Sequence, residues 1–210
     1  MQIKYKGCDI SHHQGIVDFT RVKKEVDFCL IKLGGSDKRN GSMYIDTRFE
    51  QYYKACKENG INVGCYWFAG KYSTGTERGL EEAEYVRKAI RGLKFEMPVY
   101  LDYEYGDSSM RVSNTNFCIT FCDTLELYRY FVGIYASDIS GFKQMLDNTK
   151  LSAYTHWVAR YGNQPNYVKN WDVWQYTSKG KLSGVSGNVD LDYSRVNFPR
   201  VIKNKHFNGF

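Results

Sequence analysis

The sequence lacks any long apolar run, and no stretch approaches the 18 residues from which a membrane-spanning helix is built. Its first residues, Met1 to Lys6, are polar and lead directly into a strand-like stretch. They contain neither the apolar segment nor the cleavage site of a secretory signal. The sequence therefore predicts a chain that is made in the cytoplasm without a signal peptide and does not insert into a membrane.

Histidine is scarce, and the cysteines are not spaced as metal ligands. The chain has 4 His and 6 Cys, with neither a CxxC pair nor a His/Cys cluster. We therefore expect no metal site and no cofactor. Most of the cysteines lie inside apolar strand or helix patterns, which favours buried free thiols over disulfides. The cysteines are Cys8, Cys29, Cys56, Cys65, Cys118 and Cys122.

A concentrated block of positive charge is also missing. The net charge is +6 and the pI is near 8.9, but the Lys and Arg residues are scattered along the chain. Without an Arg-rich helix or a nucleic-acid-binding motif, we expect no nucleic-acid partner. A diffuse positive field favours approach to an anionic polymer such as a bacterial wall, and an ordinary solvated surface explains it equally well. Nothing in the sequence indicates the oligomeric state.

The sequence does contain an apolar strand that ends in two acids. Residues 98–104 begin as a buried strand and finish with Asp102 and Glu104, two positions apart. Side chains at i and i+2 share one face of a strand, with Cα atoms roughly 6.6 Å apart. Burial and mutual repulsion raise at least one pKa of such a pair, so that an acid and a carboxylate can stand side by side, as glycosidic bond cleavage requires. Two solvated acids at a strand end are the structural alternative.

Strand and helix patterns alternate through the first two thirds of the chain. Five β/α units are followed by three strand-like segments without helix periodicity between them, which predicts an irregular TIM-like (β/α)-barrel. We expect the barrel to occupy residues 1–196, and residues 197–210 to form a basic C-terminal tail or linker remnant. The expected strands are 5–11, 28–33, 61–69, 98–104, 130–136, 154–160, 172–177 and 188–193.

In such a barrel, functional residues lie at the carboxyl ends of the strands. Acids and aromatic residues converge there in the predicted arrangement, whereas a random distribution would scatter them. The aromatic side chains suit sugar rings, since Tyr and Trp combine an apolar face with a polar tip. The residues expected at this rim are Asp9, Asp102, Glu104, Asp190, Asp192, Tyr66, Trp67, Tyr135, Trp174, Gln175 and Tyr176.

Seven motifs, in order along almost the whole chain, together resemble the glycoside hydrolase family 25 lysozymes, the Chalaropsis-type muramidases. The first is DISHHQG at residues 9–15, and the central acidic strand is VYLDYE at 99–104. The motifs GCYWFA at 64–69, VGIY at 132–135 and WVARY at 157–161 resemble interior strands. WQY at 174–176 and GNVDLD at 187–192 resemble the closing strands.

The resemblance implies a barrel of five β/α units plus three strands, and hydrolysis of the β-1,4 bond between N-acetylmuramic acid and N-acetylglucosamine in bacterial peptidoglycan. It implies that Glu104 is the general acid, that Asp102 is its partner, and that Asp9 and Asp190 flank the groove. The residues expected to contact the sugar are Tyr66, Trp67, Tyr135, Trp157, Arg160, Trp174, Gln175, Asp192 and His13. The resemblance further implies a phage or bacterial lysin, with release to the wall by a holin-type route. The chain would then be either a catalytic domain separated from a wall-binding module or an enzyme that relies on its own surface.

The sequence departs from the family pattern at a few positions. His13 stands where the family varies, Trp67 replaces a frequent His, and the second strand continues as KLGG at 32–35. These departures concern substrate contacts and leave the reaction itself unchanged. Two alternatives stay open: a catalytically weak carbohydrate-binding barrel that recognises the wall, and a barrel enzyme of other chemistry. Metal or Cys/Ser chemistry is disfavoured because too few His residues are suitably placed.

Overall fold

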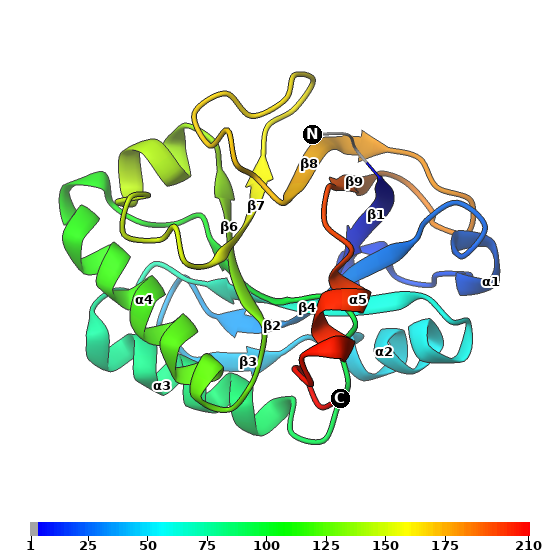
Figure 1. The fold of residues 1–210 in the computed structure, drawn as a ribbon, viewed down its shortest axis with the longest axis horizontal. Helices are drawn as coiled ribbons and strands as arrows, with labels where there is room; N and C mark the ends of the chain where they lie inside the picture. The colour runs from blue at the N-terminus through cyan, green and yellow to red at the C-terminus, as the bar shows by residue number, and fades with distance from the viewer. Residues whose placement is uncertain (1–3) are drawn as a thin grey trace.

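The computed structural model describes residues 4–210, which form a closed β-barrel (Figure 1). Of nine strands, β3 only extends β2 as a hairpin, and the other eight close the ring because β1 pairs with β9 on one side and β2 on the other. The strands are β1 (Tyr5–Ile10), β2 (Phe28–Ser36), β3 (Met43–Ile45), β4 (Asn62–Ala69), β5 (Val99–Tyr103), β6 (Val132–Ser137), β7 (Thr155–Ala159), β8 (Val173–Gly180) and β9 (Val189–Ser194). The predicted irregular TIM-like barrel is confirmed.

Seven barrel strands run parallel, and β9 is antiparallel to both of its neighbours. The carboxyl ends of the seven strands therefore meet the amino end of β9 at one rim. This direction matters for the site, since residues at the start of β9 lie beside residues at the end of β1. Asp190 is accordingly the register partner of Asp9.

Helices cover only part of the barrel. In Figure 1, α2, α3 and α4 lie along the lower and left outside of the ring, whereas β7, β8 and β9 are joined by loops. The helices are α1 (Phe19–Val22), α2 (Phe49–Glu58), α3 (Thr76–Ala89), α4 (Arg111–Leu127) and α5 (Phe198–Asn204), with short turns η1 (His12–Gln14), η2 (Ser108–Met110) and the π-helix η3 (Ser140–Met145). The five units followed by three strands thus appear as predicted, with η3 in place of the fifth α-helix.

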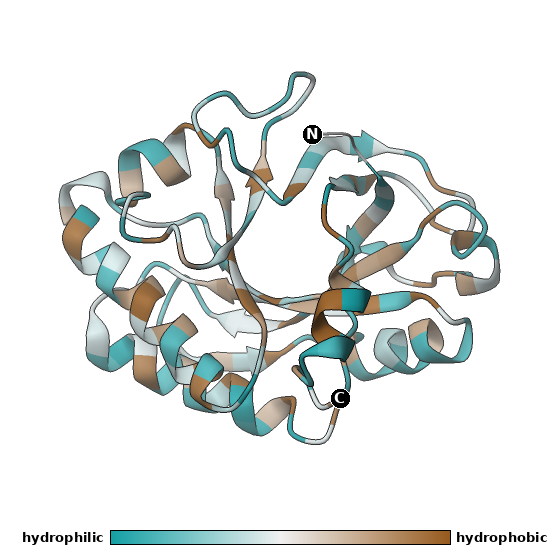
Figure 2. Ribbon diagram, in the orientation of Figure 1, coloured by the Kyte–Doolittle hydropathy of each residue, from teal (hydrophilic) through white to brown (hydrophobic). Residues whose placement is uncertain are grey.

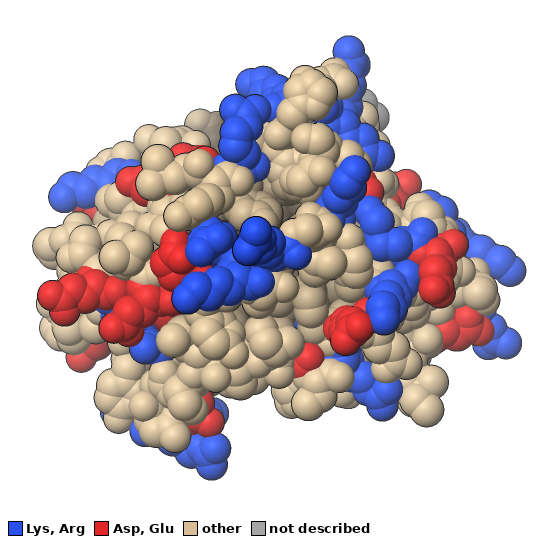
Figure 3. Space-filling model, turned by 90° about the horizontal axis from the view of Figure 1, so that it is seen from below, with Lys and Arg blue, Asp and Glu red and all other residues tan. Residues whose placement is uncertain are grey.

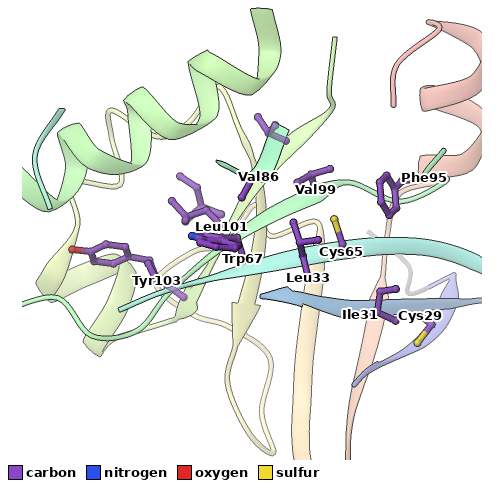
Figure 4. Close-up of a cluster of buried hydrophobic side chains, with 14 of the residues drawn as sticks. Cys29, Ile31, Leu33, Cys65, Trp67, Val86, Phe95, Val99, Leu101 and Tyr103 are labelled. Carbon is purple, nitrogen blue, oxygen red and sulfur yellow. The ribbon is translucent and has the colours of Figure 1, made fainter. Parts of the chain in front are cut away.

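The main hydrophobic core lies between the barrel strands and the helices. Figure 2 shows apolar residues recurring along the strands and along α3 and α4, with polar residues between them on the helices. Figure 4 shows Leu33 of β2, Leu101 of β5 and Val86 of α3 in this layer, and all three are fully buried. Burial of each such side chain contributes about 1.5–3 kcal/mol. All six cysteines are buried and free, as predicted.

The C-terminal residues close the amino-terminal end of the barrel. Phe198 and Ile202 of α5 are buried against side chains inside the barrel at this end. Asn208 is fully buried, donates to the carbonyls of Phe95 and Met97, and accepts from the backbone of Phe131. The expected boundary at residue 196 therefore coincides with no break in packing, and residues 197–210 form the floor of the barrel instead of a linker.

One strand lies outside the expected set. The short strand β3 was not foreseen, because its three residues follow a polar glycine-containing loop. The chain then enters α2 at Phe49 without a side-chain cap from Arg48. Just before this helix, Oδ1 of Asp46 accepts from the Arg48 backbone at 2.9 Å.

The surface carries mixed charge. On the face drawn in Figure 3, Lys and Arg side chains lie next to Asp and Glu side chains in several groups, and wide uncharged areas separate these groups. Within residues 4–210, no helix is both long and apolar enough to cross a bilayer.

Candidate functional site

A pocket of about 260 Å³ opens at the rim where the parallel strands end, and four carboxylates line it. Asp9 lies near the end of β1, Asp102 lies in β5, and Glu104 follows directly after β5. Asp190 comes from the start of β9, which reaches this rim because β9 runs antiparallel. Strand termini therefore bring together acids that are up to 181 positions apart in the sequence.

Asp102 and Glu104 differ in their exposure to solvent. The side chain of Asp102 is buried, with 5% of its surface exposed, whereas Glu104 is exposed. Burial, and then the negative charge of Glu104, raise the pKa of Asp102 well above its ordinary value. Among the described residues, Oδ1 of Asp102 has no hydrogen-bond partner. A buried acceptor of this kind is available to a donor group on a bound ligand.

The opposite wall of the pocket is also crowded with acids. Burial, and then the charges of Asp192 and Asp190, raise the pKa of Asp9, while a hydrogen bond from Gln175 opposes this rise. Burial, and then the charge of Glu104, raise the pKa of Asp190 to about 6. The free site therefore favours keeping protons among its carboxyl groups. Such crowding is typical of sites that transfer protons.

A hydrogen-bond network orients Asp9. The amide Nε2 of Gln175 donates to Oδ2 of Asp9 at 2.8 Å, while Oε1 of Gln175 accepts from the hydroxyls of Tyr135 at 2.9 Å and Tyr161 at 3.2 Å. The two hydroxyl donors fix which end of the amide faces Asp9. Asp9 is thereby held by a donor that cannot take its proton.

Aromatic side chains form the base of the pocket. Tyr66, Tyr135 and Trp157 line it and pack together, with the Trp157 ring 4.4 Å from that of Tyr135 and 5.8 Å from that of Tyr66. His13 joins them from η1, and burial, then His12 and Lys32, lower its pKa. Rings beside carboxylates suit a sugar, which offers apolar ring faces and hydroxyl groups.

Nine of the fourteen residues expected at the site line this pocket: Asp9, His13, Tyr66, Asp102, Glu104, Tyr135, Trp157, Gln175 and Asp190. Trp67, Arg160, Trp174, Tyr176 and Asp192 do not. Tyr176 follows Gln175 in β8 and stacks on Tyr193, with 4.4 Å between the ring centroids.

Trp67 points away from the pocket. It is fully buried between the barrel and the helices, near Leu101 and Val86 (Figure 4). Its Nε1 donates to Oε2 of Glu82 at 2.6 Å. Successive side chains of a strand alternate between faces, so an inward Tyr66 requires an outward Trp67. The expected sugar contact of Trp67 is therefore wrong.

Trp174 and Arg160 are displaced from the site for similar reasons. Trp174 precedes the inward Gln175, packs on the outer side of the barrel, and donates from Nε1 to the Arg160 carbonyl at 2.7 Å. Arg160 pairs with Asp138, with 2.9 Å between Nη1 and Oδ2. Both residues thus support the wall of the barrel and do not line the pocket.

Asp192 lies behind the lining of the pocket. It is fully buried, and its Oδ1 accepts from Nε1 of Trp157 at 2.8 Å. It acts on the pocket indirectly, because its charge raises the pKa of Asp9.

Sequence reasoning missed seven lining residues, among them Lys32 and Tyr161. Lys32 is the single charged residue of β2, placed between the outward-facing Ile31 and Leu33. A lone lysine at an inward position of an apolar strand was the available signal. Tyr161 comes just after β7, within a motif already noted, and hydrogen-bonds Gln175.

Comparison with known proteins gives a consistent result. Residues 8–185 match the family model described as Glycosyl hydrolases family 25. The chain is 29% identical over 191 residues to the autolytic lysozyme of Clostridium acetobutylicum, covering 89% of this chain and 55% of that protein. It is 26% identical over 201 residues to lysozyme M1 of Streptomyces globisporus, covering 88% and 66% respectively.

A solved structure agrees with these matches. The catalytic domain of endolysin Ply40 from bacteriophage P40 of Listeria monocytogenes superposes with a TM-score of 0.75 at 27% identity, covering 97% of this chain and 98% of that one. By contrast, the chain spans only about half to two thirds of the length of the two curated relatives.

Proposed function

Because the chain belongs to glycosyl hydrolase family 25, we propose that it is a peptidoglycan hydrolase acting on the bacterial cell wall. In this proposal it is an N-acetylmuramidase that cleaves the β-1,4 bond between N-acetylmuramic acid and N-acetylglucosamine. The convergence of Asp9, Asp102, Glu104 and Asp190 on one aromatic-based pocket carries the proposal. The names of its relatives, an autolytic lysozyme and an endolysin catalytic domain, agree with it.

Glu104 is the proposed general acid, which protonates the leaving glycosidic oxygen. The exposure of Glu104 lets a bound sugar approach its carboxyl group directly. The buried Asp102 lies two residues earlier, in β5. The raised pKa of Asp102 keeps a proton beside Glu104 in the free site, and in the proposed reaction that proton moves to the general acid before it is transferred to the leaving oxygen. General acid catalysis of this kind contributes about 10²–10⁴-fold.

Asp102 is the proposed partner of the substrate's own 2-acetamido group. The unpartnered Oδ1 of Asp102 supports this role, since it can accept the amide N–H and orient the acetamido oxygen toward the anomeric carbon. Asp9, held by Gln175, and Asp190 then position the sugar and the water that completes hydrolysis.

Digestion of purified peptidoglycan, followed by mass spectrometry of the borohydride-reduced fragments, tests the proposal. New reducing ends on N-acetylmuramic acid are expected. New ends on N-acetylglucosamine would contradict the assigned bond. Wall retention without any new reducing end would favour the alternative, a carbohydrate-binding barrel with little or no turnover.

A further inference from the structure

A second cavity, of about 420 Å³, opens beside the acid pocket and shares His13, Lys32 and Phe68 with it. Its outer wall is the β2–β3 hairpin, from the turn that contains Lys38 to Tyr44 of β3. We call it the hairpin cavity. Because the two cavities share three lining residues, a ligand in the acid pocket can extend into the hairpin cavity.

The hairpin cavity carries positive charge that the protein does not neutralise. Arg39 pairs with Asp37, with 2.9 Å between Nη2 and Oδ2, and Nδ1 of His12 lies 2.6 Å from a carboxylate oxygen of Asp46 outside the lining. Neither Lys32 nor Lys38 forms an ion pair with any described residue. The ammonium group of Lys38 is therefore free to bind an anion. That of Lys32 also lies near enough to Asp102 to oppose the rise in the pKa of that carboxyl group.

Aromatic rings hold these two ammonium groups without neutralising them. Nζ of Lys32 is 4.5 Å from the centroid of the Phe68 ring, and Nζ of Lys38 is 5.6 Å from that of Tyr105. The two rings pack edge to face, 5.4 Å apart. Cation–π contacts of this kind orient a cation and leave its charge available.

The two neighbouring cavities have opposite charge. The acid pocket repels an anionic group, whereas the hairpin cavity attracts one. A glycan bound across both would therefore place a neutral sugar ring at the acids and a negative substituent at the lysines. Muramic acid differs from glucosamine in such a substituent, because its lactyl group ends in a carboxylate that is either free or amide-linked to a stem peptide with further carboxylates.

We propose that the hairpin cavity is a carboxylate-binding subsite, which recognises the anionic substituent of muramic acid through Lys38 and Lys32. The proposal rests on the peptidoglycan hydrolase function proposed above. It gives the enzyme a way to tell muramic acid from other N-acetylated sugars by charge.

The test uses Lys38→Gln, because Lys38 is exposed and does not line the acid pocket. Three soluble substrates are compared: peptidoglycan strands with stem peptides, amidase-trimmed strands that carry only lactyl carboxylates, and strands whose carboxyl groups are converted to methylamides. Lys38→Arg tests rescue by charge, and Lys143→Gln, an exposed lysine on η3 outside both cavities, is the matched control.

Lys38→Gln is expected to raise KM about two- to fivefold on a charged substrate, as for a partly exposed charge pair, with kcat unchanged. Lys38→Arg should restore KM, and the neutral strands should not distinguish the variants. An effect on stem-peptide strands alone identifies the peptide carboxylates, and one on trimmed strands identifies the lactyl group. If Lys38→Gln had the same KM as the wild type on both charged substrates, the subsite would be overturned. A rise in KM on the neutral strands as large as that on the charged ones would overturn it as well. If the wild-type protein cuts none of the three, the proposed function itself fails.

Discussion

Gln175 holds Asp9 by a 2.8 Å hydrogen bond from Nε2, and its own Oε1 is occupied by the hydroxyls of Tyr135 and Tyr161. Three segments far apart in the sequence thus fix one carboxylate at the rim of the barrel. The arrangement makes Gln175 a positioning residue, since it acts on the pocket through Asp9.

Gln175→Glu should therefore damage turnover without unfolding the barrel. The hydroxyls of Tyr135 and Tyr161 can still donate to the new carboxylate, but its second oxygen meets Asp9 with like charge. Loss of a buried hydrogen bond to a charged group costs about 1.5–3 kcal/mol. We expect kcat/KM to fall about tenfold to a hundredfold and its pH profile to shift upward, because a further negative charge raises the pKa of Asp9.

Gln144→Glu on η3 is the control, because Gln144 is exposed and its side chain has no hydrogen bond among the described residues. An unchanged pH profile in Gln175→Glu, whatever the loss of rate, would remove Gln175 from the positioning role.

Glu104→Gln tests the proposed general acid. The amide keeps the size of the side chain but cannot deliver a proton, so activity should fall about 10²–10⁴-fold. The fold and binding to insoluble wall should persist, as measured by thermal unfolding and by co-sedimentation. Glu77→Gln, an exposed residue in the first turn of α3, should keep full activity. A loss below tenfold in Glu104→Gln would assign the proton transfer to another group.

Much of this arrangement could be predicted from the sequence. Strand and helix periodicity predicted the barrel, because apolar spacing is set by which face of each element is buried. The four acids could be placed at one rim because each stands where an apolar strand begins or ends. The antiparallel direction of β9 brings Asp190 to the same end as Asp9.

The aromatic contacts were harder to predict. Tyr66 and Trp67 were both expected at the site, although neighbours in a strand face opposite sides. The structure shows that Trp67 is the one that faces outward, because its Nε1 donates a hydrogen bond to Glu82 on α3. Arg160 shows the same difficulty, since its partner Asp138 lies 22 positions earlier and no local pattern links them.

The pKa of Asp190 predicts how stability depends on pH. In the folded protein it is raised to about 6 from 3.8, so the folded state keeps a proton that the unfolded chain has already lost between these values. The free energy of unfolding must therefore fall as pH rises through this window. Asp190→Asn removes this cost. Its melting temperature should exceed that of the wild type at pH 7 and match it near pH 3.5.

For a chain of this size, each kcal/mol added to the free energy of unfolding raises the melting temperature by about 2–4 °C. Asp107→Asn is the opposite-sign control, because hydrogen bonds from the backbone and side chain of Ser109 lower the pKa of Asp107. That variant should not gain stability at pH 7. Equal gains for Asp190→Asn at both pH values would show that its effect is unrelated to titration.

The stereochemical outcome separates two routes for the proposed reaction. Asp102 and Glu104 are two residues apart at the end of β5, so Asp102 stands beside the acid and not across the sugar ring from it. It is poorly placed to attack the anomeric carbon from the opposite side. Its unpartnered Oδ1 is instead suited to orient the 2-acetamido group, whose carbonyl oxygen then forms the bond as in substrate-assisted glycosidases.

Attack by the acetamido oxygen followed by hydrolysis gives two inversions, and we therefore expect net retention. Proton NMR of the first-formed product, recorded before mutarotation, should show the β-anomer. A stable thiazoline mimic of the cyclised intermediate should also inhibit the wild type and lose affinity in Asp102→Asn, because the partner of its ring nitrogen is then uncharged. An initial α-product would instead mean a single inversion, in which Asp9 or Asp190 activates water from the far side of the ring.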